Sequence, residues 1–270
     1  MIKRALFKYL ASKPKVVSQM LTATGIKRAV FETVYGDISV PVNSKSIIQA
    51  FLDNRYFGER EILNFLELKS ESTTVVNIGA NVGTTARIFQ KTQKYRTIKC
   101  FEPDPDNFNG LKTNCESCAA TELHNTAIGS INGFLPLNLN HKSVGKHSFM
   151  VSFSQGSIKV PVATLDQYLS SGEKYDIFAD VEGWEIEVLK GAVPILKNCQ
   201  LCALEWNEHL HDLSAKNDML RIVRDAGFTH FFDLADIKKL RNISALPEIK
   251  GQRDVVFVRR ERNGPTTLSP

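Results

Sequence analysis

Two carboxylates follow an apolar run in the segment DIFADVEGWEIEVLKGA, residues 176–192. The run at residues 177–179 ends at Asp180, and Glu182 follows with one residue between them. Carboxylates are seldom placed at the edge of a core without a partner or a task. We therefore expect Asp180 to act as the general base of a site at this strand end. We expect Glu182 to shape the turn, either by capping the next helix or by holding the loop.

A second polar group follows the next apolar run, in CALEWNEH at residues 202–209. Glu205 and Asn207 could hold Mg²⁺ together with Asp180, because carboxylate and amide oxygens suit this hard cation. His209 is a further candidate for the catalytic base, although a lone histidine beside an apolar strand is more often a surface residue. The residue types leave the choice between a protein base and a metal open.

A glycine loop between a strand and a helix, NIGANVGTT at residues 77–85, predicts a ligand site. Gly79 and Gly83 allow tight turning and close approach of a ligand to the backbone, and the helix N-terminus offers N–H groups. The next strand ends at Glu102, about twenty residues on, where its carboxylate can accept hydrogen bonds from two ribose hydroxyls. These features favour an adenosine-containing cofactor over a loop that only lets the helix pack on the strand.

Position 81 decides which adenosine cofactor fits best. The dinucleotide fingerprint G-x-G-x-x-G needs a glycine there, but the residue is Asn81. A P-loop is also absent, because no G-K-[ST] follows a strand. S-adenosylmethionine carries adenosine and an amino-acid tail but no phosphate, and it suits this loop better. A nicotinamide-dependent oxidoreductase and a catalytically degenerate cofactor-binding module remain as alternatives.

From about residue 56 to residue 258 the sequence resembles the FkbM-type methyltransferases. The motifs that carry the resemblance are, in order, VVNIGANVGTT, CFEPDPDNFNGLKTN, NTAIGSINGFLPLNL, VPVATLDQYL, DIFADVEGWEIEVLKGA and CALEWNEH. The resemblance implies a Rossmann-like methyltransferase fold with S-adenosylmethionine as the methyl donor. It also implies O-methylation of a hydroxyl on a saccharide, glycoconjugate or natural-product acceptor.

The resemblance also assigns cofactor-binding residues by position. The glycine-loop residues would line the methionine part and an acid would bind the ribose: Gly79, Asn81, Gly83 and Glu102. Asp104 belongs to the same EPDP segment and is counted with them. Asn77 departs from the family pattern, which commonly has an acid that helps to hold the cofactor's amino group. Asn77 can still accept a hydrogen bond but brings no charge.

Alternating strand and helix patterns from residue 71 onward must position these side chains. They predict an α/β fold with a doubly wound, mainly parallel sheet, whose ligands bind at the carboxyl ends of the strands. Asp104 is the expected N-cap of a helix that begins at Pro105, Thr164 caps a short helix, and Gly191 closes another. The segments expected to be strands are 73–80, 97–103, 122–129, 133–140, 147–153, 157–165, 175–180, 200–207, 229–234 and 254–260.

The chain is expected to divide into three parts. Residues 1–70 form an N-terminal extension with a basic start, a short strand and a helix, residues 71–262 form the Rossmann-like domain, and residues 263–270 form a flexible tail. A β-hairpin insertion at residues 131–160 should help to shape the acceptor pocket. We expect Trp184 to be a core residue, whereas Trp206 could be core or a platform for a sugar.

Charge is distributed unevenly along the 270 residues. The ends carry +7 over residues 1–30 and +5 over residues 238–262, so the net charge of +5 leaves the middle at −7. An acidic centre argues against a nucleic-acid partner and leaves a small-molecule or glycan acceptor. The basic N-terminus could contact an anionic membrane surface, but no run reaches the length of a membrane span. Five cysteines and the lack of a signal peptide indicate a reduced, cytoplasmic protein whose oligomeric state the sequence leaves open.

Overall fold

The computed structural model describes residue 23 and residues 25–259, except residues 54, 57, 141–146, 150–155, 171 and 209–212. The basic start of the chain, the proposed tail and His209 therefore lie outside the described residues. The division of the chain at residue 70 stays a prediction. No helix in the described part of the chain is long and apolar enough to cross a bilayer.

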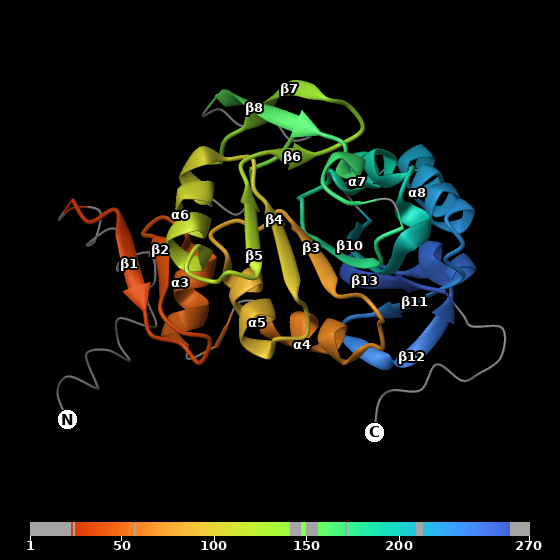
Figure 1. Cartoon of the computed structure of the whole chain (residues 1–270), viewed down its shortest axis with the longest axis horizontal. Helices are drawn as coiled ribbons and strands as arrows, with labels where there is room; N and C mark the ends of the chain where they lie inside the picture. The colour runs from red at the N-terminus through yellow and green to blue at the C-terminus, as the bar shows by residue number, and fades with distance from the viewer. Residues whose placement is uncertain are drawn as a thin grey trace.

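An eight-stranded sheet forms the centre of the molecule, in the order β12-β11-β13-β10-β9-β3-β4-β5 (Figure 1). Five neighbouring strands are parallel: β3 (Thr74–Ile78), β4 (Thr97–Phe101), β5 (Thr121–His124), β9 (Tyr175–Ala179) and β10 (Cys199–Asn207). Three antiparallel strands complete it: β11 (His230–Asp233), β12 (Asp236–Asn242) and β13 (Gln252–Val258). The predicted mainly parallel α/β sheet is confirmed. Strand β12 was not predicted, because this edge strand is mostly polar and half-exposed and lacks the apolar pattern of a core strand.

Helices cover both faces of this sheet, so the doubly wound arrangement is also confirmed. One face packs against α3 (Lys45–Leu52), α4 (Glu59–Glu67), α5 (Thr84–Thr92) and α6 (Pro105–Cys115). The other packs against α7 (Glu185–Ala192) and α8 (Leu213–Asp225). Successive strand residues alternate between the two cores, as Val75 and Val76 do, because side chains on a strand point to opposite faces.

A small second sheet lies over one end of the central sheet, at the top of the view in Figure 1. It consists of β6 (Ala127–Ile128), β7 (Gly133–Asn138) and β8 (Ser157–Ala163) in the order β6-β8-β7. The single strand expected at residues 122–129 is therefore wrong, because its two halves belong to different sheets. The break falls at Asn125, whose side-chain amide donates to the carbonyl oxygens of Glu102 and Pro103.

The N-terminal part adds a two-stranded antiparallel ribbon, β1 (Arg28–Phe31) and β2 (Ile38–Pro41), beside α6. The short strand and the helix expected in this part correspond to β2 and α4. Ile38 and Val40 are fully buried in the same core as α6. Asn114 of α6 also bonds both the N–H and the carbonyl group of Ser39. The ribbon therefore packs onto the domain through side chains and backbone together.

Two local predictions about helix ends are wrong. The short helix after Thr164 is one 3-10 turn, η2 (Leu165–Gln167), and the Thr164 hydroxyl does not cap it. Gly191 lies inside α7 rather than after it. A Cβ atom at Gly191 would lie 2.0 Å from the carbonyl oxygen of Gly129, so glycine is needed for α7 to pack closely against the chain that follows β6. Sequence alone gives no sign of such a packing contact.

Candidate functional site

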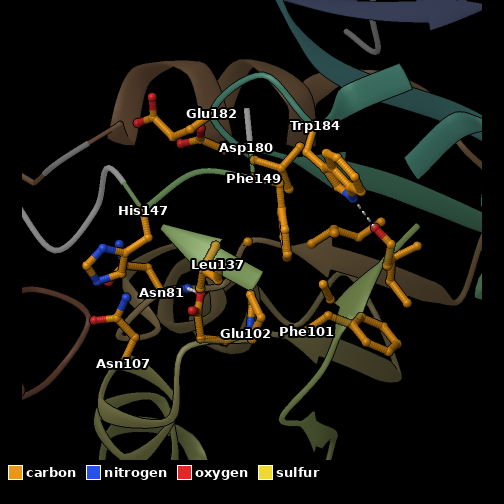
Figure 2. Close-up of a pocket in the computed structure, with 16 residues that line it drawn as sticks. Asn81, Phe101, Glu102, Asn107, Leu137, His147, Phe149, Asp180, Glu182 and Trp184 are labelled. Carbon is orange, nitrogen blue, oxygen red and sulfur yellow. Dashed lines mark hydrogen bonds between the residues drawn. The ribbon is translucent and has the colours of Figure 1, made fainter. Parts of the chain in front are cut away.

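Two adjoining cavities open where β3, β4 and β9 end, at the carboxyl edge of the central sheet. We name the first the nucleoside cleft (Figure 2); its lining residues are Ile78, Gly79, Asn81, Phe101, Glu102, Pro103, Asn107, Ala127, Ile128, Leu137, His147, Phe149, Asp180, Val181, Glu182 and Trp184. We name the second the acidic cavity; it is lined by Ser46, Ile47, Gly58, Glu61, Ile62, Asn81, Thr85, Phe178, Asp180, Glu182, Glu205, Gln252 and Asp254. Asn81, Asp180 and Glu182 line both, so the two cavities meet at these residues.

The glycine loop lies between the two cavities. Gly79 and Gly83 are each needed there for a different packing contact. Gly79 has a φ of 77°, and a Cβ atom there would lie 1.9 Å from the carbonyl oxygen of Asp180. Gly83 has a φ of 93°, and its Cβ atom would lie 2.8 Å from the Cys115 sulfur. Gly79 thus lets the loop after β9 approach, while Gly83 lets α6 pack against the start of α5. Gly83 is not among the residues that line either cavity.

Asn81 also has left-handed backbone geometry, with a φ of 51°. Asparagine tolerates this region better than most residues. Its side-chain oxygen accepts a hydrogen bond from the Val82 N–H at 2.8 Å, and its own N–H donates to Glu102. The side chain that replaces the dinucleotide glycine is therefore part of the loop, at the junction of the two cavities.

Glu102 is the central acid of the nucleoside cleft, and it is 5% exposed. One carboxylate oxygen accepts from the Asn81 N–H and the other from the Asp104 N–H, each at 2.9 Å. Burial, together with the charge of Asp104, raises the pKa of Glu102 to about 7, although hydrogen bonds from the two N–H groups and from the Asn107 side chain lower it. A carboxylate offers about four lone-pair sites, so these three donors leave capacity for a further hydroxyl donor, such as one of a ribose.

Asp104 caps α6, as predicted: its side chain accepts from the Asn107 N–H at 2.8 Å, and Pro105 is the first helical residue. Asp104 is itself 5% exposed and is not among the lining residues of the cleft. Its cap instead fixes the helix that brings Asn107 to the cleft. Its N–H also holds one oxygen of Glu102.

Asp180 lies at the end of β9, where the two cavities meet. Protein atoms crowd the carboxyl group and, with the negative charges of Glu182, Asp254, Glu205 and Glu185, raise its pKa well above the usual value. Because Asp180 is exposed to the cavities, water offsets part of the effect of burial, and the negative charges of its acidic neighbours keep its pKa raised. A carboxylate with a raised pKa is a better proton acceptor.

The three residues considered for Mg²⁺ differ in their surroundings. Glu205 is 2% exposed, and its two oxygens accept from the amides of Asn207 and Gln252. The Asn207 side chain thus donates its N–H to Glu205, and both Glu205 oxygens already accept hydrogen bonds that a metal ion would have to replace. Within the described ranges, no three His, Cys, Asp or Glu residues come together as a metal-binding group. The donor set does not favour a preformed site, and we assign no chemical step to a metal.

Asn77 lies below the glycine loop, where it is 2% exposed and aligned with Cys100 and Phe178 on the neighbouring strands. Within the described part of the chain, its amide nitrogen has no close hydrogen-bond partner and lies beside the Cys100 thiol. It does not line either cavity. A contact from Asn77 to a bound cofactor therefore stays a prediction.

Several lining residues were missed by the sequence analysis. Asn107 comes from α6, Leu137 from β7, and His147 and Phe149 from the connection between β7 and β8. Asn107 and Leu137 lie inside the motifs CFEPDPDNFNGLKTN and NTAIGSINGFLPLNL, but neither was assigned to the site. His147 and Phe149 belong to the insertion that was expected to shape the acceptor pocket, and no motif marks them.

The structure also bears on three expectations about Trp184, Trp206 and Glu182. Trp184 is half-buried and lines the cleft as well as packing on the core, and its indole N–H donates to the Ile128 carbonyl oxygen at 3.2 Å. Trp206 is 1% exposed and is a core residue. Glu182 has a φ of 50° and forms the turn itself, but no side chain caps α7. The carboxylate of Glu185 accepts from the Gly183 N–H there instead.

The fold is that of a Rossmann-like α/β domain, with a cleft at the switch point of its sheet. Residues 77–229 match the model of the methyltransferase FkbM domain, which is more than half of the chain. The chain therefore belongs to the FkbM methyltransferase family.

Two relatives share part of the sequence. A hexuronic acid methyltransferase of Haloferax volcanii is 29% identical over 157 residues, which are 55% of this chain and 62% of that protein. A 2-O-methyltransferase of Sinorhizobium fredii is 25% identical over 168 residues, with 55% and 68% covered. The match thus spans less than two thirds of the Haloferax protein. A solved structure of M. jannaschii TYW2 in complex with AdoMet is 12% identical, with 87% of each chain covered and a TM-score of 0.42.

Proposed function

We propose that this protein transfers the methyl group of S-adenosylmethionine to a hydroxyl of a saccharide. The observation that carries the proposal is Glu102: a buried acid at the switch point that lines the cleft and whose two carboxylate oxygens are each oriented by a backbone N–H. Membership of the FkbM family and the names of the two relatives support the same reaction. When bound, the cofactor supplies an electrophilic methyl group.

The nucleoside cleft would hold the adenosine part of the cofactor. Glu102 would accept hydrogen bonds from the ribose hydroxyls, and Phe101, Ile128 and Leu137 supply apolar surface for the base. Asn81 lies where the two cavities meet and would face the methionine part. A pyrophosphate binds against glycine backbone at the position that Asn81 occupies here. The Asn81 side chain therefore favours a cofactor without phosphates.

Asp180 would remove the proton from the acceptor hydroxyl. As the acceptor oxygen bonds to the methyl carbon, the bond from that carbon to sulfur breaks and the hydroxyl proton passes to the Asp180 carboxylate. Its position at the junction of the cavities and its raised pKa suit this role. Much of the remaining rate would come from holding the acceptor in line with the methyl group. His209 stays a second candidate for the base.

The acidic cavity would receive the acceptor, and its charge bears on which acceptor that is. Five carboxylate side chains line it, those of Glu61, Asp180, Glu182, Glu205 and Asp254, and its described lining includes no Lys, Arg or His. A carboxylate on the acceptor would be repelled by these five acids. We therefore propose a neutral, hydroxyl-rich sugar as the acceptor rather than the hexuronic acid named for the Haloferax relative.

Calorimetric titration of the purified protein with S-adenosylmethionine and, separately, with NAD⁺ tests the cofactor. We expect S-adenosylmethionine to bind with a micromolar dissociation constant and NAD⁺ not to bind in this range. Tighter binding of NAD⁺ would favour the oxidoreductase alternative and contradict the methyltransferase proposal. Binding of S-adenosylmethionine without turnover on any acceptor would favour the degenerate binding module.

A panel of methyl glycosides then tests the acceptor, with S-adenosylhomocysteine formation as the readout. The glucoside and the glucuronide of one series differ only in the group at carbon 6, so they isolate the charge. We expect the glucoside to react at least about tenfold faster, because like charges at a binding site disfavour the wrong partner. Equal or faster reaction of the glucuronide would contradict the neutral acceptor while leaving methyl transfer intact.

A further inference from the structure

Three consecutive residues of the insertion, 147–149, lie over the nucleoside cleft; we name them the 147–149 strap. They belong to the connection between β7 and β8, and Ser148 forms an isolated bridge with Asn138, the last residue of β7. The two backbone hydrogen bonds of this bridge are 3.0 and 3.1 Å long. His147 and Phe149, on either side of Ser148, both line the cleft (Figure 2).

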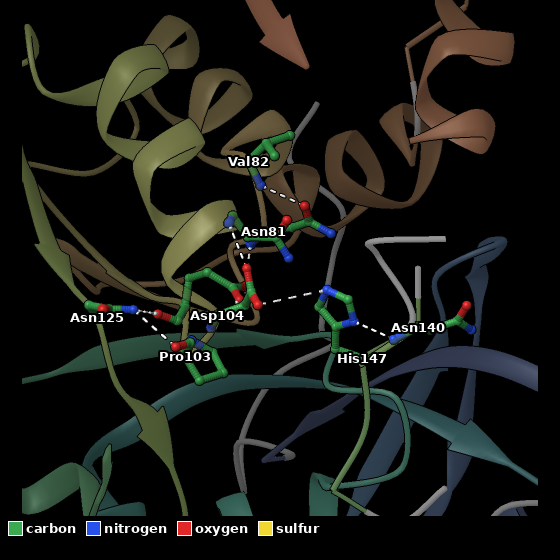
Figure 3. A network of polar contacts seen from close by, with 9 residues as sticks. Asn81, Val82, Pro103, Asp104, Asn125, Asn140 and His147 are labelled. Atoms are coloured by element: carbon green, nitrogen blue, oxygen red, sulfur yellow. Dashed lines mark hydrogen bonds and ion pairs between the residues drawn. The ribbon is translucent and has the colours of Figure 1, made fainter. Parts of the chain in front are cut away.

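One end of the strap contacts the segment that holds Glu102 (Figure 3). The Nε2 atom of His147 lies 3.9 Å from one carboxylate oxygen of Asp104, and the two side chains are only 9% and 7% exposed. The other oxygen of Asp104 caps α6 by accepting from the Asn107 N–H. The Nδ1 atom of His147 accepts from the Asn140 N–H at 2.9 Å, which places the ring proton on Nε2, facing Asp104.

The other end of the strap contacts the loop that follows β9. The Ser148 hydroxyl donates to the Glu182 carbonyl oxygen at 3.1 Å. The ring of Phe149 lies 4.6 Å from the ring of Trp184, at an angle of 35°. The strap therefore joins the β4 side of the cleft to the β9 side and crosses the switch point between them.

We propose that the 147–149 strap is the roof of the cofactor site and that the contact between His147 and Asp104 is the latch that keeps it closed. The latch acts on the residue whose N–H orients Glu102, so closing the roof and arranging the ribose acceptor are coupled. His147 is a positioning residue in this scheme. Its role rests on the proposed use of the cleft for S-adenosylmethionine.

The roof itself can be tested without any cofactor. Of the two tryptophans, Trp206 is 1% exposed, so a neutral quencher such as acrylamide reports mainly on Trp184, which the strap covers. We expect His147→Ala to raise the quenching constant about twofold, because an unlatched roof exposes Trp184. The matched control is His230→Ala. His230 lies on β11, next to the edge strand β12 and several strands away from the cleft. Quenching equal to that of the control would overturn the latch.

The second readout is the dissociation rate constant of S-adenosylmethionine, measured by stopped flow. We expect His147→Ala to release it about fivefold faster, because the polar contact between the His147 Nε2–H and the Asp104 carboxylate is lost. His147→Gln should restore most of the affinity, because its amide can still donate toward Asp104. Asp104→Asn keeps the helix cap, since Asn and Asp cap equally well, but removes the charge. Combined with His147→Ala, it should add little further loss.

The outcomes separate the two proposals. Increased quenching with unchanged release would show that the roof opens without holding the cofactor, and it would overturn the strap's role at the site. Additive losses in the double variant would remove the latch between His147 and Asp104. Absence of S-adenosylmethionine binding by the wild-type protein would instead overturn the proposed function, while the quenching result would still decide whether the latch exists.

Discussion

Two aspartates lie at the two ends of strand β9, Asp176 within it and Asp180 directly after it, and their surroundings are opposite in kind. Asp176, near its start, is fully buried and accepts from the hydroxyls of Ser70, Ser72 and Tyr95 and from the Leu201 N–H. Asp180 follows its end, is exposed to two cavities, and has carboxylates as its main electrostatic neighbours. Within the described residues, no hydrogen-bond donor to its carboxylate is found.

The comparison separates a structural acid from a candidate functional one. Burial raises the pKa of Asp176 as well, but hydrogen bonds from Ser70, Tyr95 and Ser72 offset part of that effect. Asp176 thus ties the segment before β3, the residue Tyr95 just before β4, and strand β10 together at the amino edge. Nothing comparable in the described part of the chain holds Asp180, whose neighbours destabilise its negative charge. A carboxylate with such neighbours does not stabilise the fold, and its raised pKa makes it a candidate for proton transfer.

The largest effect is expected from Asp180→Asn, measured as S-adenosylhomocysteine formation. Turnover should fall about 1000-fold, because the acceptor hydroxyl loses its base. The dissociation constant of S-adenosylmethionine should change by less than about threefold, since the substitution leaves Glu102 untouched. Turnover close to that of the wild type would move the role of base to another residue, and His209→Ala would be the next variant to measure.

Asp176→Ala should act on stability instead. Four donors would lose their acceptor in a buried site, which is expected to lower the free energy of unfolding by about 3 kcal/mol in urea denaturation. The matched variant Asp180→Ala should leave the free energy of unfolding unchanged or slightly higher, because it relieves repulsion. If the two variants lost stability equally, the distinction between the two edges would not hold.

Glu102 combines features of both aspartates, since it is held by two N–H groups and is also proposed to bind the ribose. With a pKa of about 7 in the protein without cofactor, it becomes protonated as the pH falls, and a protonated oxygen is a poorer acceptor. Affinity for S-adenosylhomocysteine should therefore decrease below pH 7, approaching tenfold per pH unit well below that value. Above pH 7 it should level off.

Glu102→Gln is the control for this profile. It should bind about tenfold more weakly than the wild type at pH 8, through loss of a charged acceptor. Its own profile should lack the step near pH 7 while keeping any contribution from Asp254, whose pKa burial and neighbouring carboxylates raise to about 6. A step that persists in the Gln variant would belong to a different group.

The smallest effect concerns the charge of the acidic cavity away from Asp180. The double variant Glu61→Gln, Asp254→Asn removes two carboxylates from the lining without changing its shape. We expect the preference for a neutral glycoside over the matching glucuronide to narrow about threefold. A matched exposed variant, Asp236→Asn on β12, should leave the ratio unchanged. An unaltered ratio in the double variant would mean that these two acids do not contact the acceptor.

The sequence by itself determined the alternation of strands and helices, the α6 cap at Asp104 and the positions of Gly79, Glu102 and Asp180 at strand ends. These follow from local rules: two-residue periodicity, capping chemistry and the order of strands in a doubly wound sheet. The roles of the individual site residues remain proposals. The family resemblance also followed from sequence motifs, and the match over residues 77–229 agrees with it.

Only the tertiary structure decided what surrounds those residues. It brought His147 and Phe149 onto the cleft from a connection without a motif, and it gathered Glu61 and Asp254 near Asp180 from more distant parts of the chain. It also showed that Gly83 lets α6 pack closely against the start of α5 and that Gly191 lies inside α7, where it packs against Gly129. These facts depend on contacts between segments far apart in the chain, which are fixed when the elements pack and leave no local pattern in the sequence.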